Sequence, residues 1–284
     1  MGSMTLELEL VDDVNEPIVM PDSAISTDDK IALLRFSIGN TSNDWQIENV
    51  QIKTELITLD NGLQNTYDAH LLSGNAYPIN YNTFITQSQN VIGGADAAGL
   101  SLGQQKINLS VSRAVTRLKS VFITLDKAIP YENDSKARKP WNDFYSPMHA
   151  YATPYEGNNS MYDQRGEFET QIQIGSKKYP ETEMRSHAEA YYQLKKCLGF
   201  QSSSVHSFDI SASEYRNSKF IMGYDLEKKL GSGFTGVSTK AGDLMTIRFN
   251  HLDTEPNNYA TQVYITLHSD NVLEIRESGI SVFD

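Results

Sequence analysis

Histidine, cysteine and acidic side chains are the groups that could bind a metal ion or move a proton, so their spacing is considered first. The six histidines of the chain are His70, His149, His187, His206, His251 and His268. None of them forms the His-Glu-x-x-His pattern that places two ligands on one helix face, and none has a neighbouring cysteine pair. The spacing favours surface or hydrogen-bonded histidines and predicts no zinc site.

Oxygen ligands for a harder cation alternate along one acidic loop, at Asp253, Glu255 and Asn257. A twelve-residue calcium loop also requires a glycine and a terminal glutamate at fixed positions, and this loop has neither. Acidic loops between strands are usually solvated turns. We therefore expect no metal ion and no cofactor.

Catalysis through a nucleophile or a bound phosphate also lacks support. The single cysteine, Cys197, falls in a predicted helix without an evident base partner, where a free cysteine is usually a small buried apolar group. The glycine-rich run 93–99 lacks the lysine and hydroxyl residue of a phosphate-binding loop. These observations predict that the protein is not an enzyme.

Charge and hydropathy argue against two kinds of partner. The 284-residue chain has a formal net charge of −12, which would repel a phosphate backbone, and no basic stretch offsets it. No run of 18 apolar residues occurs, and the N-terminus lacks a signal-like sequence. We expect neither nucleic-acid binding nor a membrane span. The 39% hydrophobic content is enough for a packed core.

Most of the chain has the pattern of short β-strands, in which apolar and polar residues alternate between turn residues. Closely spaced strands with such turns indicate an all-β fold of antiparallel sheets packed as a sandwich. The predicted strands cover residues 5–11, 31–38, 45–59, 81–86, 106–111, 120–125, 168–174, 205–210, 220–224, 244–249, 261–268, 272–276 and 280–283.

Two short helices are expected among these strands. The first covers residues 60–72 and has an apolar stripe that we expect in the core, formed by Leu63, Tyr67 and Leu71. The second covers residues 186–198. There, Ser186 and Glu189 have the spacing of a capping box, which marks the start of a helix.

The two halves of the chain resemble each other. Residues 121–125, Val-Phe-Ile-Thr-Leu, and residues 263–267, Val-Tyr-Ile-Thr-Leu, differ at one position. Each of these two segments is preceded, in the same order, by a predicted strand, a short helix and further strands. Strand composition is restricted, so five matching residues can also arise by chance. The ordered match predicts two similar sandwiches in tandem, over residues 4–126 and 167–284, joined by a connecting loop at 127–166.

The connecting loop is rich in aromatic residues, which contribute contact area at protein interfaces at low entropic cost. It is an equally good interpretation that these rings cover the two hydrophobic cores. The candidate interface residues are Tyr131, Trp141, Phe144, Tyr145, Tyr151, Tyr155 and Tyr162.

Two tandem sandwiches, each with a helix in a connection, resemble the viral jelly-roll coat proteins, and more specifically the double jelly-roll major capsid proteins of DNA viruses. Residues 168–175, Phe-Glu-Thr-Gln-Ile-Gln-Ile-Gly, and residues 234–247 are similar to coat-protein sequences from viruses of aquatic eukaryotes. The resemblance covers most of the chain.

The resemblance implies upright jelly rolls, three copies in a pseudo-hexagonal capsomer, and no catalysis. It also implies a location in the virion, assembly inside the host cell, and contacts with other coat proteins. The chain is short for two full jelly rolls. Missing N-terminal strands, a single elaborated sandwich or a different family would each account for that.

Three functional readings follow, in decreasing order of support. The first is a structural coat subunit that self-assembles, as a homotrimer or larger, through loops and strand edges. The second is a carbohydrate-binding or adhesive sandwich, with exposed aromatic rings as platforms for sugars. The third is a hydrolase on a sandwich scaffold, for which the sequence names no nucleophile.

Overall fold

The computed structural model describes residues 6–9, 46–90, 106–126, 169–199, 210–211, 215, 219–227, 235–240, 244–250 and 262–284. The chain divides into two compact units. The first unit comprises Met1–Tyr81, Pro130–Pro140 and Val272–Phe283, and the second comprises Asn82–Ile129, Trp141–Asn271 and Asp284. Each unit is described by itself below.

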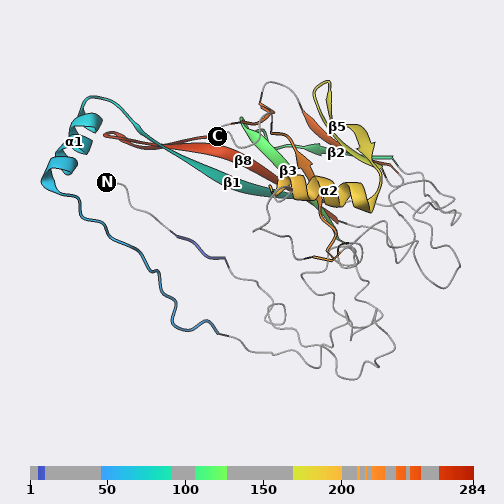
Figure 1. The fold of residues 1–284 in the computed structure, drawn as a ribbon, viewed down its shortest axis with the longest axis horizontal. Helices are drawn as coiled ribbons and strands as arrows, with labels where there is room; N and C mark the ends of the chain where they lie inside the picture. The colour runs from blue at the N-terminus through green and yellow to red at the C-terminus, as the bar shows by residue number, and fades with distance from the viewer. Residues whose placement is uncertain are drawn as a thin grey trace, which may run out of the picture. The chain divides into compact units, whose positions relative to one another are not determined.

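Strands dominate the described residues, with two helices among them (Figure 1). In chain order the elements are α1 (Asn61–Leu72), β1 (Tyr77–Asn90), β2 (Lys106–Val111), β3 (Leu118–Asp126), β4 (Glu169–Ile174), β5 (Lys177–Met184), α2 (His187–Cys197), β6 (Met222–Asp225), β7 (Met245–Asn250), β8 (Gln262–Arg276) and β9 (Gly279–Phe283).

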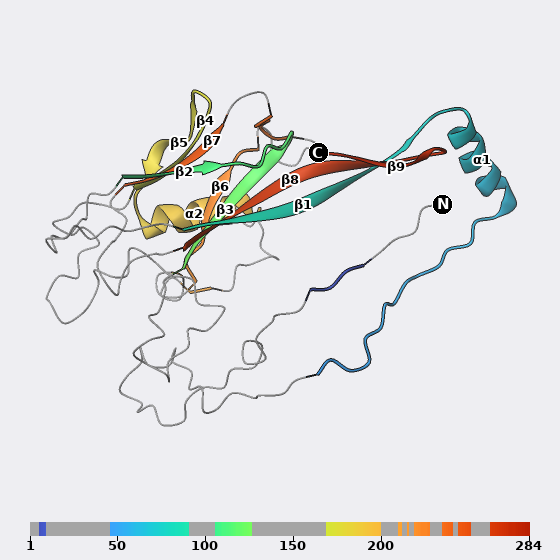
Figure 2. The same ribbon diagram turned by 180° about the vertical axis from the view of Figure 1, so that it is seen from behind.

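The strands form two antiparallel sheets. One has the order β1-β8-β3-β6, with β9 also paired to β8, and the other has the order β2-β7-β4-β5. Along the chain, strands β1 to β4 alternate between the sheets, β5 stays with β4, and β6 to β8 alternate again, as Figure 2 shows from behind. Eight strands connected in this way between two sheets form a jelly roll. The predicted class, an antiparallel jelly-roll sandwich with two helices, is confirmed.

The two similar pentapeptides are partners in one sheet. Residues 121–125 of β3 pair antiparallel with residues 263–267 of β8, with Ile123 opposite Ile265 at the centre. Likewise β2 pairs with β7. Strands on either side of residues 127–166 therefore share both sheets, and the described strands form one sandwich rather than two in tandem.

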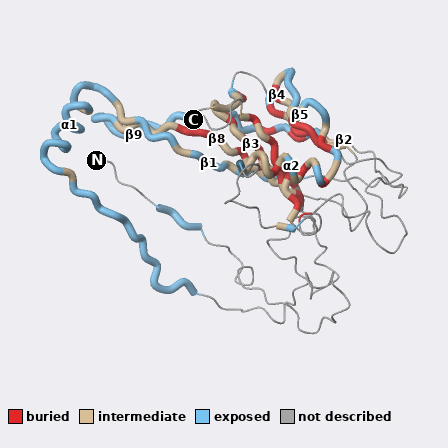
Figure 3. The backbone as a smooth tube through the Cα atoms, in the orientation of Figure 1, coloured by how far each residue is buried: buried red, intermediate tan, exposed pale blue. Residues whose placement is uncertain are grey.

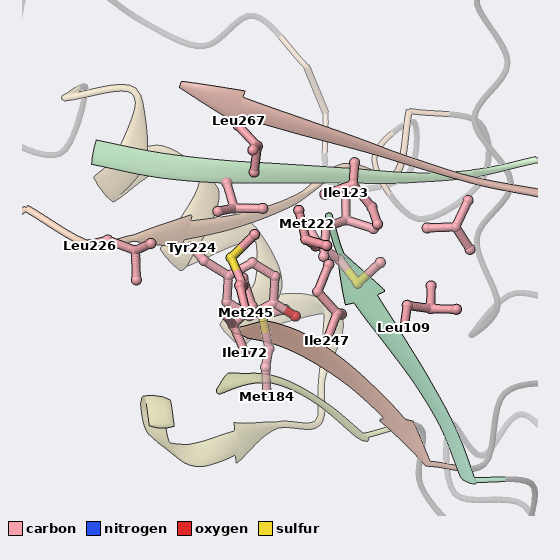
Figure 4. Packing of buried hydrophobic residues seen from close by; sticks show 14 of the residues in the cluster. Leu109, Ile123, Ile172, Met184, Met222, Tyr224, Leu226, Met245, Ile247 and Leu267 are labelled. Atoms are coloured by element: carbon pink, nitrogen blue, oxygen red, sulfur yellow. The ribbon is translucent and has the colours of Figure 1, made fainter. Parts of the chain in front are cut away.

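One hydrophobic core fills the space between the two sheets (Figure 4). Ile123 and Leu267 contribute from the first sheet, and Ile172 and Ile247 from the second. All four are fully buried or nearly so, as their alternate positions along the strands require. Every buried hydrophobic residue of the described chain lies between Leu109 and Leu267, within the second unit.

Strand β8 corrects one sequence prediction. The predicted strands at 261–268 and 272–276 leave Ser269, Asp270 and Asn271 as a turn between them, but β8 runs through these residues without a break and all three are buried. The Ser269 hydroxyl lies 3.0 Å from that of Thr83, and the Asp270 amide donates to the carbonyl of Arg117 at 3.1 Å. Turn-forming residues remain in a strand here because most of their polar groups, though not Asp270 Oδ2, find partners inside the protein.

Strand β5 was not predicted, because Pro180 interrupts its sequence. Proline has no backbone N–H to donate to a neighbouring strand, so within a sheet it is confined to edge strands. β5 is such a strand, since it pairs only with β4 at the end of its sheet. The Gln171 side chain donates to the carbonyls of Pro180 and Glu181, at 2.8 and 3.2 Å.

Two predicted strands near the N-terminus are not strands where the structure describes them. Residues 6–9 and 46–59 have no sheet partner, and nearly all of their side chains are exposed. Alternating sequence is not sufficient for a strand, because the backbone groups also need a neighbouring strand. The predicted strands at 31–38 and, apart from Ile210, at 205–210 lie outside the described residues.

Both helices form where the sequence predicts them. The side chain of Asp60 accepts from the Leu63 amide and caps α1, and Ser186 accepts from the Glu189 amide and caps α2. The predicted core stripe on α1 is wrong, because α1 has no buried residue and Leu63 and Tyr67 are 46% and 43% exposed (Figure 3). An apolar stripe shows that a helix can pack, but not what covers it.

Gly236 provides a test of the packing beside β3. A Cβ atom on Gly236 would lie 2.7 Å from the carbonyl carbon of Arg117 and 2.9 Å from the Leu118 oxygen. These backbone atoms are held by the bridge between Leu118 and Val237. We expect Gly236→Ala to lower the free energy of unfolding by about 1–3 kcal/mol in urea denaturation. Ser238→Ala, at an exposed neighbouring position, is the control, and equal midpoints for the two variants would contradict the packing described.

Candidate functional site

The seven aromatic residues predicted as an interface, Tyr131, Trp141, Phe144, Tyr145, Tyr151, Tyr155 and Tyr162, lie outside the described residues. The acidic loop with Asp253, Glu255 and Asn257 and the glycine-rich run at 93–99 also lie outside them. These remain predictions. The described residues offer three other places where polar groups gather.

The first is a cleft of about 680 Å³ lined by the β4–β5 hairpin, α2 and β6. Lys177 and Lys178 line it with exposed side chains. Lys196 is paired instead, with its Nζ 3.1 Å from Oδ2 of the buried Asp225 carboxylate. The lining residues include neither histidine nor cysteine. The cleft is therefore a polar depression with two cationic groups rather than a site with a nucleophile and a base.

The second is a polar depression of about 190 Å³ on the β2-β7-β4 sheet. Asn108, Arg248 and Gln171 lie side by side across its three strands. The Glu169 carboxylate accepts from Asn250 Nδ2 at 2.8 Å and lies 3.1 Å from an Arg185 nitrogen. The lining contains no aromatic ring of the kind expected for a sugar platform.

The third is a group of charges where β3 meets β8. The register shifts between Leu118 and Ser120, so Lys119 has no Cα partner in β8. Its Nζ lies 3.1 Å from a Glu227 oxygen and 3.5 Å from an Asp270 oxygen. Burial alone would lower the pKa of Lys119, but hydrogen bonds and charge from Glu227 and Asp270 outweigh it and raise that pKa. Lys119 is therefore a charged structural group at the bulge.

His268 lies beside these charges. Its Nδ1 is 3.0 Å from the Ser120 hydroxyl, and its ring stacks on Phe84 with centroids 4.5 Å apart. Partial burial, and then the positive charge of Lys119, lower the pKa of His268 from 6.5. The neutral imidazole is thus a hydrogen-bonded packing group. Among the described residues, no group of three or more His, Cys, Asp or Glu side chains could hold a metal ion.

The lowered pKa of His268 predicts a pH dependence of stability. The pKa of His268 is 6.5 in the unfolded chain and lower in the folded chain. Between these two pKa values the unfolded chain binds a proton at His268 and the folded chain does not. The free energy of unfolding therefore falls as pH falls through that window. His268→Gln, which retains a hydrogen-bonding group for Ser120, should reduce this slope in urea titrations between about pH 5 and 7.5. Identical slopes for the variant and the wild type would contradict this assignment.

Cys197 is a packing residue. It faces Gly223 of β6, where an added Cβ would lie 3.2 Å from the sulfur and 3.1 Å from the Leu194 Cα. Burial, and then the negative charge of Asp225, raise the pKa of the thiol to about 12. The thiol stays protonated at neutral pH, so it is a poor nucleophile.

The expectation that the chain contains no Gly-x-Ser-x-Gly pattern is wrong. Residues 99–103, Gly-Leu-Ser-Leu-Gly, have the spacing of a nucleophile turn, in which the serine stands between a strand and a helix. The next described element is the strand β2, beginning at Lys106, rather than a helix. The pattern therefore lacks the context that gives it catalytic meaning, and its own residues lie outside the described chain.

Comparison with known proteins gives matches to solved structures alone. No protein-family model matches the chain, and no curated protein sequence does. The structure of VP54 from PBCV-1, fitted into a reconstruction of the virophage Sputnik, is 10% identical, with a TM-score of 0.41, and covers 73% of this chain and 51% of that one. The PBCV-1 capsid structure is 11% identical, with a TM-score of 0.41, and covers 78% and 54%.

A third match is the mavirus major capsid protein, 13% identical with a TM-score of 0.33, covering 75% of this chain and 42% of that one. The chain thus spans about half the length of the first two matched structures and less of the third. The matches are to viral capsid structures, the class that the sequence resembles. No described helix has the length and apolar composition needed to cross a bilayer.

Proposed function

We propose that this chain is a structural coat subunit of a virus, which self-assembles through loops and strand edges and has no catalytic role. The supporting observation is the distribution of apolar residues between the two units. Among the residues that the structure describes, the buried hydrophobic ones all lie in the second unit. The exposed large hydrophobic residues lie in the first unit, with the exceptions of Phe84, Tyr192 and Leu244.

A unit with exposed apolar residues and no described buried ones gains stability only when another surface covers it. In a coat protein that surface belongs to neighbouring subunits. The jelly roll supports the proposal because this sandwich is a recurrent capsid fold, although lectins also use it. The virion is then the location, with assembly in the host cell and contacts to other coat proteins.

The loop at 127–166 is part of the proposal. Its seven aromatic residues, named above, would lie between copies, where rigid rings add contact area. The family resemblance implies a homotrimer, but the described strands supply one sandwich per chain. Three copies would bring together three sandwiches.

The molar mass of the purified protein, measured by light scattering across concentration, tests self-assembly directly. We expect a trimer or a larger species, because the exposed apolar residues are covered only when copies associate. The measured mass divided by 31.8 kDa gives the number of copies. A protein that stays monomeric at every concentration would contradict the proposal and favour the carbohydrate-binding reading, which a glycan panel and Trp141→Ala would then test.

The aromatic loop is tested by Tyr145→Ala. If this ring is buried between copies, its loss should cost about 1–2 kcal/mol of association free energy, or roughly a tenfold higher concentration for half-assembly. Tyr192→Ala, on the exposed side of α2, is the matched control and should leave the midpoint unchanged. Equal midpoints for both variants would remove Tyr145 from the interface.

A further inference from the structure

The outer edge of β9 has no partner among the described residues. β9 follows β8 through a two-residue turn and pairs with it from Val272 opposite Phe283 to Arg276 opposite Gly279. β9 pairs with no other described strand. An open strand edge is a template for another strand, and proteins usually block it with charges, proline or a cover.

The direction of the free backbone groups follows from the turn. A two-residue turn makes Arg276 and Gly279 a hydrogen-bonded pair. Hydrogen-bonded and non-hydrogen-bonded pairs then alternate along an antiparallel ladder. The N–H and C=O groups of Ile280 and Val282 therefore point away from β8, toward the open edge.

The hairpin also has an aliphatic face. Leu273 lies opposite Val282, and Ile275 lies opposite Ile280, so these four side chains share one face of the β8–β9 ribbon. Ile280 and Val282 are 52% and 55% exposed, and β9 has no buried residue (Figure 3). The other face has the ion pair between Glu274 and Arg276, at 2.7 Å. Val272 and Phe283 lie on that second face as well, so one face of the ribbon is aliphatic and the other is mixed. The aliphatic face reaches the open edge.

Charge does not block this edge. β9 contains no ionisable residue, although the chain has a net charge of −12. The nearest carboxylates in sequence are Glu277 before it and Asp284 after it. The Asp284 carboxylate is already paired with Lys240, at 2.9 Å. This segment therefore lacks the repulsion that would keep two copies of an acidic protein apart.

We propose that β9 pairs antiparallel with β9 of a second copy, in a register centred on Ser281. This inference rests on the proposed role as a self-assembling subunit and names one of its contact surfaces. In this register Ile280 of one copy lies opposite Val282 of the other. The outward N–H and C=O groups of these residues then meet as two hydrogen-bonded pairs related by a two-fold axis.

Self-complementarity is the reason that the partner is a second copy. Ile280 opposite Val282 places aliphatic side chains together on one face, and Gly279 lies opposite Phe283. Asp284 falls opposite Ser278, so no carboxylate faces another. The β8–β9 hairpins of the two copies then belong to one sheet, and their aliphatic faces join into a larger apolar surface than either hairpin has alone.

The test is cysteine cross-linking through Ser281→Cys in the full chain. In the proposed register the two residues at position 281 form a non-hydrogen-bonded pair, with Cα atoms about 4.5 Å apart, within the range that a disulfide spans. Ser278→Cys is the matched control, because six strand positions separate the two copies of residue 278 by about 20 Å. Cys197 is present in both variants, so any cross-link through it contributes equally to the two.

We expect Ser281→Cys to give about tenfold more disulfide-linked dimer than Ser278→Cys on a non-reducing gel after mild oxidation. Adding Val282→Pro to Ser281→Cys should abolish the dimer, because proline removes an outward N–H that the second copy uses. The hairpin should survive, since that N–H does not face β8. Circular dichroism checks that each variant is folded.

Equal cross-linking at positions 278 and 281, or none at 281 in a protein that assembles, would overturn the β9 contact and leave the coat role standing. Cross-linking that persists with Val282→Pro would overturn the proposed register. A wild-type chain that is monomeric in light scattering would instead contradict the proposed function itself. Cross-linking at 281 in such a chain would still establish the β9 contact.

Discussion

Val121, Ile123 and Leu125 of β3 pair with Leu267, Ile265 and Val263 of β8, and all six side chains are buried. The rest of the sandwich depends on this ladder. β3 holds β6 on its other edge, β8 holds β1, and the second sheet packs on the apolar face that the two strands create. Without this ladder, β3 and β6 would be separated from β8 and β1, and α2, which packs on β6 at Gly223, would be separated with them.

The charged group at the bulge limits how β3 and β8 can align. Lys119 pairs with Glu227 and Asp270, and the Asp270 amide bonds to the Arg117 carbonyl. A partly buried ion pair adds little net stability, but misplacing one partner is costly because it leaves a charge unpaired. A one-residue slip would also turn the apolar residues of β3 out of the core. Charge and alternation thus select the same register.

Local patterns in the sequence predict the elements well and their partners poorly. Alternation locates β2, β3, β4, β7 and β9 to within about two residues, because successive side chains of a strand point to opposite faces. The same alternation cannot tell which strand lies beside which. The match between residues 121–125 and 263–267 therefore suggested two sandwiches, although it reflects two neighbours that face the same core from one sheet.

Other differences have equally local causes. Pro180 concealed the edge strand β5, and Ser269, Asp270 and Asn271 resembled a turn because their buried partners are distant in sequence. The three polar clusters of the described chain were also not predicted, since each joins residues from separate strands. Of the candidate site, the aromatic loop at 127–166 remains a sequence prediction.

The jelly-roll connectivity also determines the order in which the protein can mature. The Thr83 and Ser269 hydroxyls are bonded across 186 residues, so the first sheet cannot close until β8 has been synthesised. At roughly 5–20 residues per second, the ribosome needs on the order of ten seconds or more for that interval. β9 is made directly after β8. A nascent chain therefore exposes the edge proposed for self-pairing only when its sandwich can close, which delays association until the subunit can fold.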